Sequence, residues 1–291
     1  MKHVYGWLLL TPAAILLIGF THYPAAATLF QSVFSTGTAV RPSRFVGLDN
    51  YAALLEDPTF VQVLWNNFWF SLGTIPTSMA LALLMALWVN GGVNRKLPGL
   101  ALVRMSYFTP TILPMIAVAN LWLYFYTPQI GLLDKVTGIF GAPSHNWLGD
   151  PHTVMGCLVA MTLWKEAGFF MIFYLAALQA LPPELEEAAR VEGASRWYYF
   201  RRVTFPLLMP TTLFVLVNAT INSFKLVDHL FILTKGGPDN ASNLLLYYIY
   251  QVAFSFFDTA YAATLTVVLL ILLGTLAVVQ FQLVERRVHY R

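Results

Sequence analysis

Four polar side chains in one apolar stretch of the sequence have types and spacing suited to contact with a polar solute. They recur at intervals of four, three and four residues, as Asn218, Asn222, Lys225 and His229. On a helix, this spacing predicts a single face. Ionisable groups within a bilayer usually face protein or water, and amides both donate to and accept from hydroxyl groups. We interpret this face as a candidate passage for a hydroxyl-rich solute.

Asp228 leaves a second interpretation of the same stretch open. It lies three residues after Lys225, so the two charges could pair and hold their helix against a neighbour without touching a solute. For Lys225 and Asp228, the sequence favours neither this pairing nor a direct role in the passage. For Asn218 and Asn222, contact with solute is favoured over packing alone.

Expected neighbours of the passage come from the apolar segment around Pro110 and Pro114. Helices in membranes tolerate such breaks where protein or a water-filled path satisfies the freed backbone groups. The two prolines are followed by Asn120 and Tyr124, which indicates a helix that bends beside a polar cavity. We therefore add Asn120 and Tyr124 to the candidate passage.

The sequence contains no motif that indicates catalysis, metal binding or nucleotide binding. The histidines, including His22, His145, His152 and His229, show neither metal-ligand spacing nor a nucleophile partner. Cys157 is the one cysteine, and we expect it to be a small packing residue. The sequence lacks a Gly-x-x-x-x-Gly-Lys-Ser/Thr phosphate loop. We expect no metal, no bound cofactor and no catalytic residue, which argues against an intramembrane enzyme.

About six transmembrane helices must position these side chains. The 291 residues are 58% hydrophobic and 11% charged, whereas soluble domains are roughly a quarter charged. Long uncharged intervals predict an all-α integral membrane protein, in one domain over residues 1–291. We place the spans at residues 7–34, 66–89, 103–126, 153–180, 206–231 and 259–283. The fourth span contains Lys165 and Glu166, which we expect to pair with other helices rather than with solute.

The distribution of basic residues predicts that both chain ends are cytoplasmic. Lys and Arg concentrate in the segments that this orientation places inside, among them Arg95, Lys96, Arg201 and Arg202. A cleavable signal peptide ending near Ala25–Ala27 is the less favoured alternative, because its loss would break the even number of spans. The net charge of +3 reflects this bias, and we expect no nucleic-acid partner.

The polar segment 181–205, between the fourth and fifth spans, is predicted to be a cytoplasmic docking element. Pro183 and the carboxylates that follow it suit a helix N-terminus, and Gly193 suits a helix end or a tight turn. A second short helix is predicted from about Arg196 to Val203, before Pro206 at the membrane. Small, acidic and aromatic residues alternate here, which favours docking over a merely solvated loop.

This segment resembles the EAA loop of permeases of bacterial ABC importers. The resemblance rests on Glu187-Ala188-Ala189, Gly193-Ala194 and Val203-Thr204-Phe205-Pro206, at the spacing of that family. Val203 and Phe205 replace the usual Ile and Leu, and Glu192 stands where Asp is common.

Further similarity, to carbohydrate-uptake permeases of the maltose and glycerol-3-phosphate type, extends over nearly the whole chain. It includes Phe45–Tyr51, Leu178-Gln179, Ser223-Phe224-Lys225 and Gly236-Gly237-Pro238. The end of the chain, from Val279 to Tyr290, resembles the A-type permease of the glycerol-3-phosphate system.

The resemblance implies that this loop is a coupling helix that docks on a separate ATPase. The residues so assigned are Glu187, Ala188, Ala189, Glu192, Gly193, Ala194 and Pro206. It further implies a second homologous permease, two ATPase subunits that use ATP and Mg, and a periplasmic or lipid-anchored solute-binding protein. The chain would then lie in the bacterial inner membrane and pass a sugar, polyol or glycerol phosphate. The rival is a secondary transporter driven by an ion gradient through Asp228 or Glu166.

Overall fold

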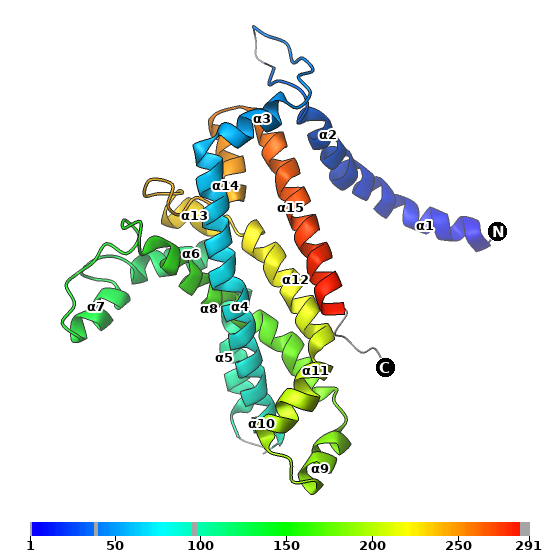
Figure 1. The fold of residues 1–291 in the computed structure, drawn as a ribbon, viewed down its shortest axis with the longest axis vertical. Helices are drawn as coiled ribbons and strands as arrows, with labels where there is room; N and C mark the ends of the chain where they lie inside the picture. Colours follow the sequence, from blue (N-terminus) through cyan, green and yellow to red (C-terminus); the bar gives the residue numbers. More distant parts are fainter. Residues whose placement is uncertain (1, 38–39, 95–97, 286–291) are drawn as a thin grey trace. The chain divides into compact units, whose positions relative to one another are not determined.

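The computed structural model describes residues 2–37, 40–94 and 98–285, in which helices joined by loops are the regular secondary structure (Figure 1). Within these ranges there is no strand, only an isolated antiparallel bridge between Phe34 and Phe45. The first helices are α1 (Lys2–Leu17), a π-helical turn (Ile18–His22), α2 (Tyr23–Gln31), α3 (Asp49–Glu56), α4 (Pro58–Asn94), α5 (Leu100–Ile112), α6 (Met115–Phe125), α7 (Leu132–Ile139) and α8 (Val154–Gln179). Then follow α9 (Pro183–Val191), α10 (Arg196–Tyr199), a π-helical turn (Phe200–Thr204), α11 (Phe205–Leu207), α12 (Met209–Lys225), α13 (Asp228–Leu233), α14 (Leu245–Tyr250), another π-helical turn (Gln251–Ser255) and α15 (Thr259–Glu285).

Four of these helical stretches are long and apolar enough to cross a membrane, and two bent pairs bring the number to six if each pair is one span. The four are Leu8–Gln31, Pro58–Gly91, Val154–Gln179 and Thr259–Leu283. The pairs are Leu100–Ile112 with Met115–Phe125, bent by 100°, and Arg196–Leu207 with Met209–Leu233, bent by 66°. The predicted all-α membrane architecture is confirmed. Arg95, Lys96 and the segment 286–291, which carry part of the charge bias and of the C-terminal resemblance, lie outside the described residues.

Helix breaks follow the prolines only in part. The bend expected at Pro110 and Pro114 occurs at Leu113 and Pro114, both in extended conformation. Pro76, however, lies inside the unbroken α4. By contrast α12 ends at Lys225, before the extended Leu226, where the sequence contains no proline or glycine. The span predicted over residues 206–231 therefore contains a break in its helix after Lys225.

The chain divides into two compact units. The first contains the residues up to Val61 together with Leu245–Leu272, and the second contains Gln62–Leu244 and the residues from Leu273 onward. In the first unit, Asn50 donates hydrogen bonds to the carbonyls of Ser32 and Phe34. The Thr264 hydroxyl also donates to the Ser32 carbonyl. The segment after α2 is thereby tied to α3 and α15.

The second unit is built around α8, which contacts α5, α6 and α12. Small side chains of α4, such as Ala82 and Ala86, pack in one buried cluster with Phe170 and Tyr174 of α8 and Val215 of α12. Lipid tails provide no hydrophobic drive between helices, so small residues that permit close packing matter most.

Gly168 marks a close approach of α8 to α5. A Cβ atom built there would lie 1.8 Å from the carbonyl oxygen of Tyr107 in α5. No side chain fits between these two backbones.

Asp57 joins three helix starts of the first unit. Its carboxylate accepts hydrogen bonds from the hydroxyls of Tyr248 (2.6 Å) and Tyr261 (2.8 Å) and from the amide of Thr59 at the start of α4 (2.9 Å). Burial opposes ionisation of this group, but these hydrogen bonds outweigh it and hold the pKa of Asp57 below its usual range. The ionised carboxylate is therefore the form that the fold prefers.

Replacing Asp57 by asparagine is expected to lower the melting temperature of the purified protein at pH 7 by roughly 5 °C, since hydrogen bonds to a charged group contribute about 1.5–3 kcal/mol. A pKa below the unfolded value of about 3.9 gives stability that is present above that pH and is lost as pH falls through the folded pKa. Melting curves from pH 7 to pH 3 should therefore show the difference between the two proteins shrinking below about pH 4. Glu56→Gln, at a neighbouring exposed carboxylate, serves as the control. A difference that is constant over this range would contradict the assignment.

Candidate functional site

The predicted docking segment forms two short helices joined by a closed turn. Its first helix, α9, begins with Pro183 in the first turn and carries Glu184 and Glu186 there, as the dipole of a helix N-terminus favours. An ion pair of 2.6 Å joins Glu186 to Arg190 one turn later. The helix start predicted from these residues is confirmed.

The turn after α9 has the hydrogen bonds of a Schellman motif. The amide of Gly193 donates to the carbonyl of Arg190 (3.1 Å), and the amide of Ala194 donates to that of Ala189 (2.9 Å). Gly193 has a φ of +72°, the left-handed conformation that glycine adopts most easily. Ser195 then caps α10 by accepting from the amide of Tyr198 (3.2 Å). The turn between the two helices is thus closed by backbone hydrogen bonds and by the Ser195 cap.

The outer face of this segment is uncovered. Glu187, Ala188 and Glu192 are exposed, while Ala189 and Ala194 are half-buried beside the turn. The segment's most exposed large apolar side chains are Val191 (90%), Trp197 (68%) and Tyr198 (58%). Exposed apolar groups rimmed by charges are typical of a surface that binds another protein.

The docking segment runs directly into the fifth span. The second helix, predicted over Arg196–Val203, continues instead through a π-helical turn to Leu207, with the exposed Pro206 in its last turn. Leu208, at the 66° bend, belongs to the buried cluster of α4, α8 and α12. A displacement of the docking segment would therefore act on α12 without an intervening flexible loop.

The polar residues predicted for the passage lie on two helices rather than one. Asn218, Asn222 and Lys225 are on α12, whereas Asp228 and His229 are on α13. The prediction that all four side chains share one helical face was wrong, because the helix breaks at Leu226. Within the described residues no ion pair joins Lys225 to Asp228, and both side chains are exposed. The structural pairing considered for these two residues is not present.

The asparagines of α12 differ in their surroundings. Asn222 donates to the carboxylate of Glu166 in α8 (3.2 Å), while Asn218 donates to its own helix, at the carbonyl of Phe214 (2.7 Å). Glu166 therefore pairs with another helix, as expected. Because Asn222 is held by α8, its amide has a fixed direction.

His229 is completely buried, and its ring stacks on Phe70 of α4 with centroids 6.1 Å apart. In the part of the chain that the structure describes, neither ring nitrogen has a hydrogen-bond partner. Its assignment to the passage stays a prediction.

Asn120 and Tyr124 lie one turn apart on α6, and both side chains are exposed. The α6 helix packs against α13, so Asn120 and Tyr124 share a helix pair with Asp228 and His229 (Figure 1). The third and fifth spans thus touch through α6 and α13, while the assignment of Asn120 and Tyr124 to the passage stays a prediction.

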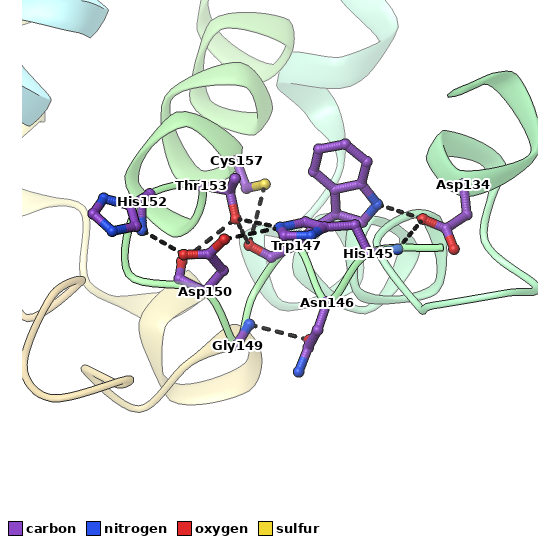
Figure 2. A network of polar contacts seen from close by, with 9 residues as sticks. All are labelled: Asp134, His145, Asn146, Trp147, Gly149, Asp150, His152, Thr153 and Cys157. Carbon is purple, nitrogen blue, oxygen red and sulfur yellow. Dashed lines mark hydrogen bonds and ion pairs between the residues drawn. The ribbon is translucent and has the colours of Figure 1, made fainter. Parts of the chain in front are cut away.

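An ordered segment connects α6 to α8. Figure 2 shows its centre, where Asp134 of α7 accepts hydrogen bonds from the indole of Trp147 (2.7 Å) and the amide of His145 (3.3 Å). The Ser144 hydroxyl and the amide of Gln129 also donate to Asp134, and together these bonds lower its pKa well below the usual range. Sequence reasoning missed this network, because Asp134 and Trp147 lie 13 residues apart and no local pattern joins them.

No group of three potential metal ligands comes together within the described ranges. Cys157 is buried, with its thiol near the carbonyl of Trp147 (3.8 Å).

Comparison with known proteins matches residues 78–290 to the family described as binding-protein-dependent transport system inner membrane component. An sn-glycerol-3-phosphate transport system permease of Agrobacterium fabrum is 34% identical, over 99% of this chain and 97% of the relative. A lactose transport system permease of Rhizobium radiobacter is 33% identical, over 98% and 95%. Among solved structures, a bacterial alginate ABC transporter, in complex with an alginate pentasaccharide-bound periplasmic protein, has a similar chain. The TM-score is 0.81 at 22% identity, over 98% of this chain and 93% of that one.

Proposed function

This chain belongs to the family of binding-protein-dependent transport system inner membrane components, and we propose that it is a permease subunit of an ABC importer for a sugar, polyol or glycerol phosphate. The proposed solute class rests on the relatives, which are named for transport of sn-glycerol-3-phosphate and lactose. The chain is proposed to work as one transmembrane domain, without enzymatic activity of its own.

The observation that carries this proposal is the exposed helix pair α9–α10 and its direct connection to α12. We propose that Glu187, Ala188, Ala189, Glu192, Gly193 and Ala194 form the joint with an ATPase subunit. Small alanines permit close approach, and the closed turn at Gly193 makes the joint stiff. Pro206 lies where the joint meets the bend at Leu208.

ATP and Mg would be bound by the ATPase subunits alone. When these subunits close on ATP, the joint moves and biases the permease between inward-facing and outward-facing states, provided that the two states differ in free energy at this contact. A second, homologous permease, two ATPase subunits and a periplasmic or lipid-anchored solute-binding protein complete the proposed importer. Both chain ends would be cytoplasmic.

We propose that solute passes beside the broken fifth span. Asn218, Asn222, Lys225, Asp228 and His229, together with Asn120 and Tyr124, are the candidate residues of this passage. Asn222 has the clearest support, since Glu166 fixes its amide and leaves its carbonyl oxygen to accept from a solute hydroxyl. Lys225, exposed and without an ion pair among the described residues, would suit a phosphate or a hydroxyl group.

The test is uptake into vesicles that contain the chain with its co-purifying partners, with sn-glycerol-3-phosphate and lactose as probes. We expect uptake of at least one probe only when ATP is present on the side of the membrane that carries the ATPase subunits. The binding protein must be present on the opposite side. Uptake that follows an ion gradient without ATP would overturn the proposal in favour of a secondary transporter. Chemical conversion of the probe would point to an enzyme instead.

In the same vesicles, Asn222→Ala is expected to lower the uptake rate about tenfold, as the loss of roughly 1.4 kcal/mol of solute contact predicts. ATP hydrolysis stimulated by the binding protein should persist, because the joint is intact. Thr109→Val is the control, since the exposed Thr109 hydroxyl donates only to the carbonyl of Met105 in its own helix. Unchanged uptake by the Asn222 variant would remove Asn222 from the passage.

A further inference from the structure

The third span breaks where its backbone cannot continue a helix. In a helix, the carbonyl of residue 110 would accept from the amide of residue 114, but Pro114 has no N–H. The chain therefore leaves the helix after Ile112 and turns by 100° into α6. Within a bilayer, each backbone carbonyl that the break frees needs another hydrogen-bond donor.

Lys165 of α8 supplies these donors. Its ammonium group donates to the carbonyls of Pro110 (2.9 Å), Thr111 (2.8 Å) and Leu113 (2.6 Å). All three N–H groups of the ammonium are thereby used. The positive charge also lies at the C-terminus of α5, the negative end of the helix dipole. The Thr111 hydroxyl returns a weaker bond to the carbonyl of Lys165 (3.3 Å).

Glu166, the next residue, is turned about 100° around the same helix and meets the other broken span. Its carboxylate accepts from Asn222, three residues before α12 ends at Lys225. Beyond the two breaks, α6 and α13 pack against each other. One turn of α8 thus anchors both spans just before they break.

We propose that Lys165 and Glu166 are positioning residues for transport. Lys165 fixes the direction in which α6 leaves the third span, and Glu166 fixes the end of α12 from which α13 departs. Neither side chain touches solute. Together they set the placement of the α6–α13 pair, and with it Asn120, Tyr124 and Asp228. The inference rests on the proposed function, because it concerns how the passage is arranged.

The test compares Lys165→Met, which keeps the length of the side chain but removes its donors, with Lys165→Arg, which keeps a charged donor. Uptake and ATP hydrolysis are measured per folded complex in vesicles. We expect Lys165→Met to lower uptake at least tenfold while ATP hydrolysis continues, and Lys165→Arg to recover most of it. Lys135→Met, at an exposed lysine of α7, is the matched control. Likewise Glu166→Gln, which keeps an acceptor for Asn222, should retain more uptake than Glu166→Met.

A second measurement reports on the position of α6. Ile116→Cys places a thiol in the first turn of α6, where the side chain is exposed, and Cys157→Ser removes the one native thiol. In the complex that carries only these two substitutions, we expect the rate of maleimide labelling at position 116 to change when the ATPase subunits bind ATP. Adding Lys165→Met should abolish this change, whereas adding Lys165→Arg should preserve it.

Three results would overturn the inference. One is a Lys165→Met complex that transports at the parental rate. Another is a lower yield of folded complex with an unchanged rate per complex, since this would reduce Lys165 to a stabilising role. The third is the absence of ATP-driven uptake by the unaltered complex, which would overturn the proposed function as well and is recognised before any variant is compared.

Discussion

Replacing Gly193 by valine is expected to lower ATP-driven uptake by more than tenfold, while Gly193→Asn retains most of it. The reason lies in the backbone, because Gly193 has a φ of +72° and nothing lies within 4 Å of the Cβ that a side chain would add. The left-handed conformation costs an L-residue about 1–2 kcal/mol and is least tolerated by β-branched residues, whereas asparagine adopts it more easily. Valine should therefore open the turn and release the hydrogen bonds at Arg190 and Ala189.

The measurement is uptake in vesicles together with co-purification of the ATPase subunits. Coupling between binding sites typically amounts to about 1–3 kcal/mol, or roughly 5- to 150-fold, so loss of the joint should fall within that range. Equal impairment by valine and asparagine would show that bulk or polarity at position 193 matters, and not the turn. Parental uptake by the valine variant would remove the segment from the coupling path.

Gly168→Leu is expected to prevent assembly of the complex almost entirely. A Cβ at this position would lie 1.8 Å from the Tyr107 carbonyl oxygen, and a backbone atom cannot rotate away as the end of a side chain can. Extra methylene groups in a packed interior usually cost about 1–3 kcal/mol. Here α5 and α8 must move apart, which also pulls the carbonyls of Pro110 and Thr111 away from Lys165.

Gly156 provides the matched control, because it lies on the same helix and a Cβ there meets nothing within 4 Å. Gly168→Ala should lower the melting temperature and the yield of the purified complex, whereas Gly156→Ala should leave both near the parental values. Thermal unfolding, followed by size-exclusion chromatography, measures the melting temperature and the yield of both variants. Similar melting of the two alanine variants would contradict the close approach.

The docking segment was predictable because its structure is encoded locally. Pro183, the carboxylates after it and Gly193 each act within a few residues, and the turn that the structure shows is the one that such residues favour. The break at Pro114 was predictable for the same reason.

The break after Lys225 was not predictable, because Leu226 and Val227 carry no local signal for it. Helix periodicity continues through this stretch, and the packing of α13 against α6 beyond it joins residues far apart in the sequence. The partners of Lys165 lie 52 to 55 residues away in the sequence and that of Glu166 lies 56 away, so only the fold reveals them. The sequence did indicate that charges within an apolar span need partners.

Lys165 contacts residues that precede it in the sequence, whereas Glu166 contacts a residue that follows it. This difference has a consequence for biosynthesis. Every partner of Lys165 is made before it, so α5, α6 and α8 can close their contacts as soon as the fourth span has entered the bilayer. Asn222 is made later, and until it arrives the acid of Glu166 lacks the partner that it has in the finished fold. We therefore expect a nascent chain that ends before α12 to be less stable in the membrane, and the insertion of α12 to stabilise it there.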